Sequence, residues 1–277
     1  MYAKLYGATL HGIDGCIITV EVDISQGLPV FDIVGLPNQS VKEARERVRA
    51  AIKNSGYDFP MRRIVVNLAP ATIRKSSAGL DLAIALGVLI ASGQIKGRKA
   101  NISALLNRCL FMGELALDGS LLPTFGTLAM SLAGLEADYS TIYTSVENGN
   151  NLKAIPNLTI YGESSLQNII TVLEDQVKSK SISTSKKVKI GNNQDEILTD
   201  TMDNKNHNTT YDVDFGDVQG QELGKRAMLI SAAGHHHCIM IGPPGGGKTM
   251  MAERLPTILP PMTWNEMVEV SRIQDVI

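Results

Sequence analysis

Short β-branched runs alternate with segments of helical spacing over the first part of the chain. Residues 16–37 (CIITVEVDISQGLPVFDIVGLP) contain two partly alternating runs on either side of Gln26-Gly27, which predicts two strands joined in a hairpin. Residues 110–123 predict a second hairpin, with its turn at Asp118-Gly119. Single strands are predicted at residues 62–70, 140–149 and 152–162.

Four segments carry apolar residues at the spacing of a helix. The first, residues 38–60, is predicted to have Ser40 as its N-cap and Glu43 at the capping-box position, and to stop at Gly56. Its buried face should consist of Val41, Ala44, Val48, Ala51 and Ile52. Residues 79–95 are apolar on nearly every side, so this helix should be buried at the centre of the core. The remaining two helices are predicted at residues 127–137 and 164–175.

These elements predict an α/β domain over residues 1–175, and the pattern then changes. Residues 176–210 are rich in Ser, Thr, Asn, Lys and Asp and have almost no apolar periodicity. Such a segment buries too little apolar surface to offset its ordering entropy, so a flexible linker is predicted. A second apolar region follows over residues 211–277.

Composition and charge exclude some classes of protein but select no partner. The chain is 44% hydrophobic, and only 5% of its residues are aromatic, which indicates a globular protein with an aliphatic core. The formal net charge of −2 gives no general attraction to nucleic acid. One exposed helical face could form a basic patch, although a solvated face with paired charges is favoured. It carries Lys42, Arg45, Arg47, Arg49 and Lys53, offset by Glu43 and Glu46.

The cysteines and the apolar runs bear on cellular location. Cys16, Cys109 and Cys238 form no CxxC pair, so neither a zinc site nor a disulfide framework is indicated. The N-terminus lacks the apolar core of a signal peptide, and every apolar run is too short to span a bilayer. A cytoplasmic protein without a membrane partner is expected.

The strongest chemical signal lies in the second apolar region. The pattern GxxxxGK[ST] is matched by Gly242, Pro243, Pro244, Gly245, Gly246, Gly247, Lys248 and Thr249. A strand-like run, residues 238–241, precedes it, and a helix-like run, residues 250–255, follows it. Glycines let backbone N–H groups turn toward phosphates, Lys248 can reach the β- and γ-phosphates, and Thr249 can hold Mg²⁺. The sequence therefore predicts a phosphate-binding loop for ATP with Mg²⁺.

Three consecutive histidines, His235, His236 and His237, stand just before this loop. On an extended segment successive side chains point to opposite faces, so the three cannot easily converge on one ion. A metal site is therefore disfavoured.

With these residues in view, the chain resembles the magnesium chelatase-like AAA+ ATPases of the YifB and ComM group. The resemblance runs nearly end to end, through GLPVFDIVGLPNQSVKEARERVRAAIKNSGYDFP, DLAIALGVLIASGQI, GELALDGSLLP and DVQGQELGKRAMLISAAGHHH. It implies an N-terminal domain of ribosomal protein S5 domain 2-like fold, related to the Lon protease domain, followed by a P-loop AAA+ module. It further implies assembly into a hexameric ring and, in ComM-like members, action on DNA in branch migration.

The AAA+ resemblance assigns nucleotide-site residues only in part. Val218, Gly220 and Gln221 match the segment near the adenine, and Gly242 to Thr249 match Walker A. Walker B, the sensor and the arginine finger have no counterpart before Ile277, since the remaining acidic residues do not end an apolar strand. These are Glu253, Glu266, Glu269 and Asp275. Loss of an arginine finger alone costs about 10³–10⁵ in rate, so binding without hydrolysis is expected, from a chain that is part of a longer protein.

The Lon relationship raises a protease hypothesis. Ser76-Ser77-Ala78-Gly79 resembles the segment that holds the nucleophilic serine of Lon, which would make Ser77 the nucleophile. Leu128 stands where the resemblance places the lysine, and Lys75 is not oriented by its spacing. A serine without an adjacent base is not activated at neutral pH, so Ser77 is expected to be a helix-entry or turn residue. Two hypotheses thus rank above a protease: a nucleotide-binding AAA+ fragment, and a non-catalytic Lon-like binding or assembly domain with a vestigial ATPase segment.

Overall fold

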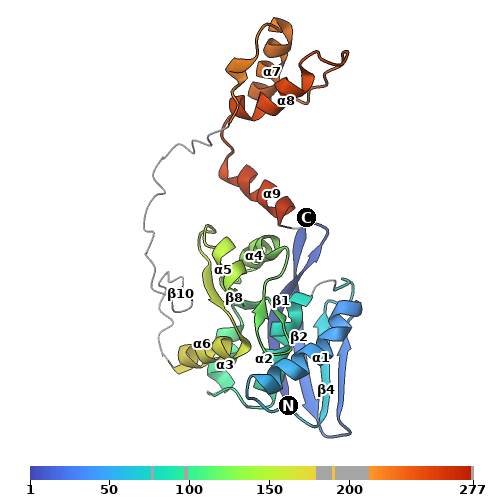
Figure 1. Cartoon of the computed structure of the whole chain (residues 1–277). Helices are drawn as coiled ribbons and strands as arrows, with labels where there is room; N and C mark the ends of the chain where they lie inside the picture. The colour runs from blue at the N-terminus through green and yellow to red at the C-terminus, as the bar shows by residue number, and fades with distance from the viewer. Residues whose placement is uncertain (76–77, 97–98, 179–188, 191–211, 276–277) are drawn as a thin grey trace. The chain divides into compact units, whose positions relative to one another are not determined.

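The computed structural model describes residues 1–75, 78–96, 99–178, 189–190 and 212–275 (Figure 1). The chain divides into two compact units, one of residues 1–193 with 269–277 and the other of residues 194–268. The predicted linker lies almost wholly outside the described residues. Its first residues continue a helix, and residues 189–190 form a short strand.

The first sheet of the larger unit has the strand order β1-β2-β4-β3. β1 (Tyr2–His11) and β2 (Asp14–Ser25) form an antiparallel hairpin, and β2 also pairs antiparallel with β4 (Arg63–Ala69). β3 (Val30–Val34) pairs with β4, in parallel. The predicted hairpin of residues 16–37 is therefore wrong. β2 forms its hairpin with β1, and β4, which follows β3 after a helix, lies between β2 and β3.

That helix, α1 (Gln39–Asn54), begins two residues earlier than expected. Asn38 is the N-cap and accepts a hydrogen bond from Val41 N at 2.9 Å, so neither Ser40 nor Glu43 caps the helix. The expected stop is confirmed, since Gly56 follows the helix with a φ of +83°. All five expected buried residues are confirmed: Val41, Ala44, Val48, Ala51 and Ile52.

Helix α2 (Asp81–Ala91) forms the centre of the core, as its apolar sequence predicts. Ten of its eleven residues are buried, and it follows a short 3₁₀ turn, η1 (Ala78–Leu80). It packs against β1, β2 and α1. The main apolar cluster of the unit surrounds it.

A second sheet has four parallel strands in the order β10-β9-β8-β5. They are β5 (Cys109–Phe111), β8 (Thr141–Ser145), β9 (Thr159–Glu163) and β10 (Lys189–Ile190). The rings of Phe111, Tyr143 and Tyr161 stack in order across β5, β8 and β9, with centroids 4.9 Å apart at each step. The strand predicted at 140–149 ends early, because Ser145 caps a helix by accepting from Asn148 N.

Helices and one hairpin complete this unit (Figure 1). β6 (Glu114–Leu115) and β7 (Leu121–Leu122) pair antiparallel on either side of the predicted Asp118-Gly119 turn. α4 (Thr127–Glu136) and α6 (Leu166–Lys178) are confirmed helices. α3 (Lys99–Leu106) and α5 (Val146–Asn151) were not predicted.

The smaller unit is built from short helices. They are the 3₁₀ turn η2 (Phe215–Asp217), α7 (Glu222–Gly234), α8 (Lys248–Arg254) and the 3₁₀ turn η3 (Leu255–Ile258). α9 (Trp264–Gln274) begins in this unit and ends in the larger one. A small core holds the unit together: Phe215, Val218, Met228 and Met251 are buried, with Met240, Leu255 and Ile258 packed against them.

The described chain is thus a mixed α/β protein with parallel strand pairs. No helix within the described ranges combines the length and the apolar character that crossing a bilayer requires.

A buried ion pair links α1 to α2. The Arg47 guanidinium, expected on the outer face of α1, instead donates to both carboxylate oxygens of Asp81, at 2.7 and 3.1 Å. Leu115 N donates to the same carboxylate at 3.3 Å. Burial nevertheless raises the pKa of Asp81 from its ordinary value of 3.8 to about 6, because desolvation of the charge outweighs these three hydrogen bonds.

This pKa shift predicts that stability falls as the pH rises. The folded state binds the Asp81 proton more tightly than the unfolded state, so the contribution of protonation is complete below about pH 4 and is lost as the pH passes 6. Relative to Asp81→Asn, the wild type should lose roughly 1–3 kcal/mol of unfolding free energy between pH 4 and pH 7. Urea unfolding of both proteins at several pH values measures this, and a constant or opposite difference would contradict it.

Candidate nucleotide-binding site

The predicted phosphate-binding loop lies on the surface of the smaller unit and leads directly into α8. Gly245 and Gly247 have φ values of +79° and +75°, in the left-handed region that favours glycine. Gly247 is the N-cap of α8, so Lys248 and Thr249 occupy its first turn. A β-carbon added to Gly242, Gly245 or Gly247 would meet no heavy atom within 4 Å, so the mouth of the loop is open.

The Lys248 side chain folds back over its own loop. Its ammonium donates to Gly242 O at 2.8 Å and to Pro243 O at 2.6 Å. These partners are neutral carbonyl groups, and an anion in the loop would attract the ammonium more strongly than they do. Thr249 is exposed on the same turn.

The strand expected before the loop is not formed. Residues 238–241 have no regular secondary structure, and the side chains of Ile239 and Ile241 are 82% and 89% exposed. A β-branched run becomes a strand only when neighbouring strands satisfy its backbone groups and cover its side chains. No strand lies beside it among the described residues of the smaller unit. Of the expected strand–loop–helix arrangement, the loop and the helix are therefore present and the strand is not.

The residues expected near the adenine lie in one segment that reaches the loop. Val218 is buried in the small core, and Gly220 has a φ of +67°. Gln221 caps α7 in the left-handed conformation, and its side-chain amide donates to Gly246 O at 3.5 Å. The structure thus brings Gln221 to the phosphate loop, whereas Val218 serves packing.

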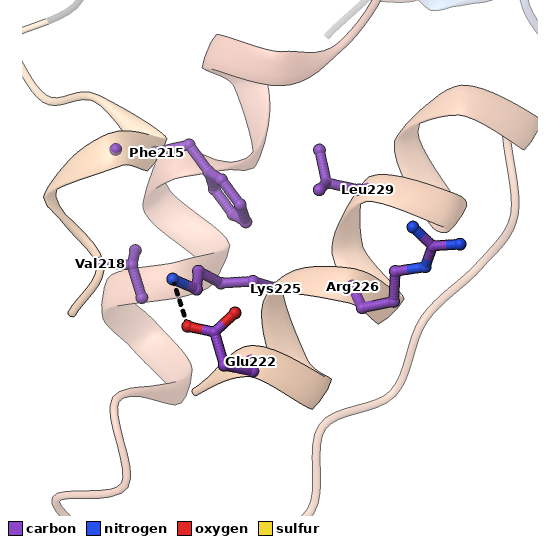
Figure 2. Close-up of a pocket in the computed structure, with 7 residues that line it drawn as sticks. Phe215, Val218, Glu222, Lys225, Arg226 and Leu229 are labelled. Carbon is purple, nitrogen blue, oxygen red and sulfur yellow. Dashed lines mark ion pairs between the residues drawn. The ribbon is translucent and has the colours of Figure 1, made fainter. Parts of the chain in front are cut away.

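A hollow of about 410 Å³ lies between η2 and α7 (Figure 2). Its wall combines apolar and charged side chains: Phe215, Gly216, Val218, Glu222, Lys225, Arg226 and Leu229. Lys225 and Glu222, both on α7, form an ion pair of 3.0 Å on its wall. It includes no residue of the phosphate loop. Apart from Val218, its residues were missed from the sequence, where only the helical spacing of ELGKRAMLI could have indicated such a surface.

The three histidines are exposed at the end of α7, where His235 is the C-cap with a φ of +51°. Among the described residues no cluster of His, Cys, Asp and Glu is arranged to hold a metal ion.

The residues of the protease hypothesis do not form a described site. Ser76 and Ser77 lie outside the described residues. Lys75 is fully buried, and its ammonium donates to Gly35 O at 2.7 Å and to Pro70 O. Burial lowers the pKa of Lys75. Leu128 is half-buried in α4, against the second apolar cluster of the larger unit. That cluster consists of Ala8, Met112, Met130, Ile142, Leu152, Ile155 and Ile160.

The comparisons with known proteins agree with these features. A family model described as subunit ChlI of magnesium chelatase matches residues 20–148, and a second model of the same subunit matches residues 214–277, which include the phosphate loop. The competence protein ComM of Haemophilus influenzae is 34% identical over 275 residues, which are 99% of this chain and 50% of ComM.

Two further relatives are similar to different extents. The uncharacterized protein YifB of Salmonella typhimurium is 37% identical over 96% of this chain and 47% of its own length. The Lon protease of Mycolicibacterium smegmatis is 26% identical over 54% of this chain and 19% of its own length. The chain thus spans about half the length of the ComM and YifB relatives that it matches.

Proposed function

The chain belongs to the family of the magnesium chelatase subunit ChlI. On this premise we propose that it is part of an AAA+ ATPase and that it binds ATP with Mg²⁺ at residues 242–249. The geometry of the phosphate loop carries the proposal. The loop GPPGGGKT is open at its mouth, two of its glycines are in the left-handed conformation, and it places Lys248 at the start of α8.

The residues of the loop have separate roles in this proposal. The backbone N–H groups of residues 245–249 bind the phosphates, and the Lys248 ammonium leaves the carbonyl groups of Gly242 and Pro243 for the phosphate charge. The Thr249 hydroxyl would hold Mg²⁺, which would neutralise part of the phosphate charge. Gln221, whose amide donates to Gly246 O, and the neighbouring Gly220 are proposed to face the base.

We further propose that this chain binds ATP without hydrolysing it. Hydrolysis needs a group that positions water and others that neutralise the charge of the transition state. Three acidic side chains of the smaller unit make other contacts: Glu222 pairs with Lys225, Asp217 with Arg254, and Glu266 accepts from Thr263.

For the whole protein we propose a ring-forming ATPase that acts on DNA. Its support is the similarity to ComM, which is named a competence protein. The larger unit, over residues 1–175, is proposed to have the ribosomal protein S5 domain 2-like fold, and the AAA+ module to begin near residue 211. A cytoplasmic location belongs to the same proposal.

A second candidate function is a non-catalytic, Lon-like binding or assembly domain. The partial similarity to Lon favours it, together with Leu128 at the position where the resemblance expects a lysine. The buried Lys75, whose ammonium is held by backbone carbonyls, offers no substitute base.

Equilibrium binding of a fluorescent ATP analogue with Mg²⁺ tests the proposal. We expect saturable fluorescence that unlabelled ATP reverses, with a phosphate-free nucleoside as the control that does not compete. If no saturable binding occurs with a folded chain, nucleotide binding is lost as a function of these residues and the assembly function takes its place.

A further inference from the structure

The segment 214–221 of the smaller unit is tied to helix α8 and the turn after it. Its far end is the end away from the phosphate loop. There Phe215 N donates to the Thr257 hydroxyl at 3.1 Å, and that hydroxyl donates to Arg254 O at 2.8 Å. At its near end, Gln221 reaches Gly246 of the phosphate loop. The segment therefore spans from the last residue of α8 to the loop at its start.

A charged contact reinforces the far end. Arg254 Nε lies 3.5 Å from Asp217 Oδ2, and the Arg254 side chain is only 14% exposed. The Asp217 carboxylate is itself held, because the same oxygen accepts from Asp214 N at 3.0 Å in a reciprocal capping box, while Asp214 accepts from Gly216 N. Arg254 therefore meets a carboxylate whose position is already fixed.

Apolar packing joins the segment to α8 between these two ends. Phe215 and Val218 share the small core with Met251, which lies in the middle of α8. Lys248 and Arg254 stand six residues apart on this helix, about 9 Å at 1.5 Å per residue. Packing and polar contacts thus join residues 214–221 to α8 along the whole length of the helix.

We propose that Arg254 is a positioning residue that makes the site selective for a nucleoside triphosphate over a bare polyphosphate. This inference rests on the proposed binding of nucleotide at residues 242–249. The phosphates need only the loop and Lys248, whereas the nucleoside beyond them needs residues 218–221 at a fixed distance from the loop. The Asp217–Arg254 contact and the Thr257 hydroxyl set that distance.

Two ligands and two variants test the assignment. We expect Arg254→Met, which keeps the apolar stem of the side chain, to weaken Mg·ATP binding by about 5- to 10-fold and to change Mg·tripolyphosphate binding by less than about twofold. Thr257→Val, nearly the same shape without the hydroxyl, should show the same selective loss. The matched control is Arg226→Met, an exposed arginine on α7, which should alter neither affinity.

Each other outcome is decisive. Equal losses for the two ligands in Arg254→Met, or no loss for either, would overturn the positioning role, and so would an unselective Thr257→Val if Arg254→Met does not fold. A wild type that binds tripolyphosphate and ATP equally overturns the role as well but leaves the loop intact. A wild type that binds neither ligand removes the proposed function itself.

Discussion

Replacing Lys248 with alanine will lower the affinity of the chain for Mg·ATP by about 10- to 100-fold. A hydrogen bond to a charged group contributes about 1.5–3 kcal/mol, and every 1.4 kcal/mol is a factor of ten in the dissociation constant. Lys248 is free to make such bonds, because its present partners are two loop carbonyls that an anion would outcompete. Titration with the fluorescent ATP analogue measures the change.

The matched control for this variant is Lys225→Ala in the same unit. Lys225 pairs with Glu222 on α7, outside the phosphate loop, and its removal changes the net charge equally. We expect the affinity of Lys225→Ala for Mg·ATP to remain within about twofold of wild type. Equal losses in both variants would mean that net charge, and not the loop, governs binding.

Gly15→Ala will destabilise the larger unit by about 2–4 kcal/mol. Gly15 lies on β2 directly beneath α4, and an added β-carbon would stand 2.4 Å from Ala129 O and 2.6 Å from Met130 Cα. Both atoms belong to the helix backbone, which cannot rotate aside as a side chain would. The helix must therefore move away from the sheet, with loss of packing across the second apolar cluster. Urea unfolding followed by circular dichroism measures the loss.

Gly12→Ala isolates the steric cause. Gly12 stands in the turn between β1 and β2, with a φ of +65° and open space around it. The same methyl group costs there only backbone strain, about 1–2 kcal/mol. A loss in Gly12→Ala as large as that in Gly15→Ala would show that close packing against α4 is not the cause.

Local patterns were sufficient for α1, α2, α4 and α6 and for the conformation of the loop, but not for α3 and α5. The five apolar residues of α1 are all buried, because a 3.6-residue period leaves one face for the core whatever that face packs against. The loop was found from eight consecutive residues, because the glycine conformations and the position of Lys248 depend on near neighbours only. The expected N-cap was wrong by two residues, since Asn38 competes with Ser40 for the same donors.

Strand pairing could not be obtained in this way. The runs on either side of Gln26-Gly27 are both strands, yet β4 lies between them, and no local feature of residues 16–37 encodes a partner that arrives after α1. The strand predicted at residues 238–241 is not formed for a related reason. Its residues favour a strand, but a strand exists only within a sheet, and the described part of the smaller unit supplies none.

Long-range polar contacts could not be predicted from the sequence either. Arg47 was placed on the solvent face of α1 by its charge, whereas the buried carboxylate of Asp81 turns it toward α2. The contact of Arg254 with Asp217 joins residues on either side of α7 and the loop. Such pairs follow from how the elements pack, which periodicity does not specify.

Hydrogen exchange of the loop amides, with and without Mg·ATP, tests the central claim most directly. The backbone N–H groups of residues 245–249 should exchange more slowly once nucleotide is bound, because phosphate oxygens replace water as their partners. The account predicts protection there and at Gln221, none in the larger unit, and less protection in Lys248→Ala at the same nucleotide concentration. Saturating nucleotide that leaves the amides of residues 245–249 unprotected would contradict it.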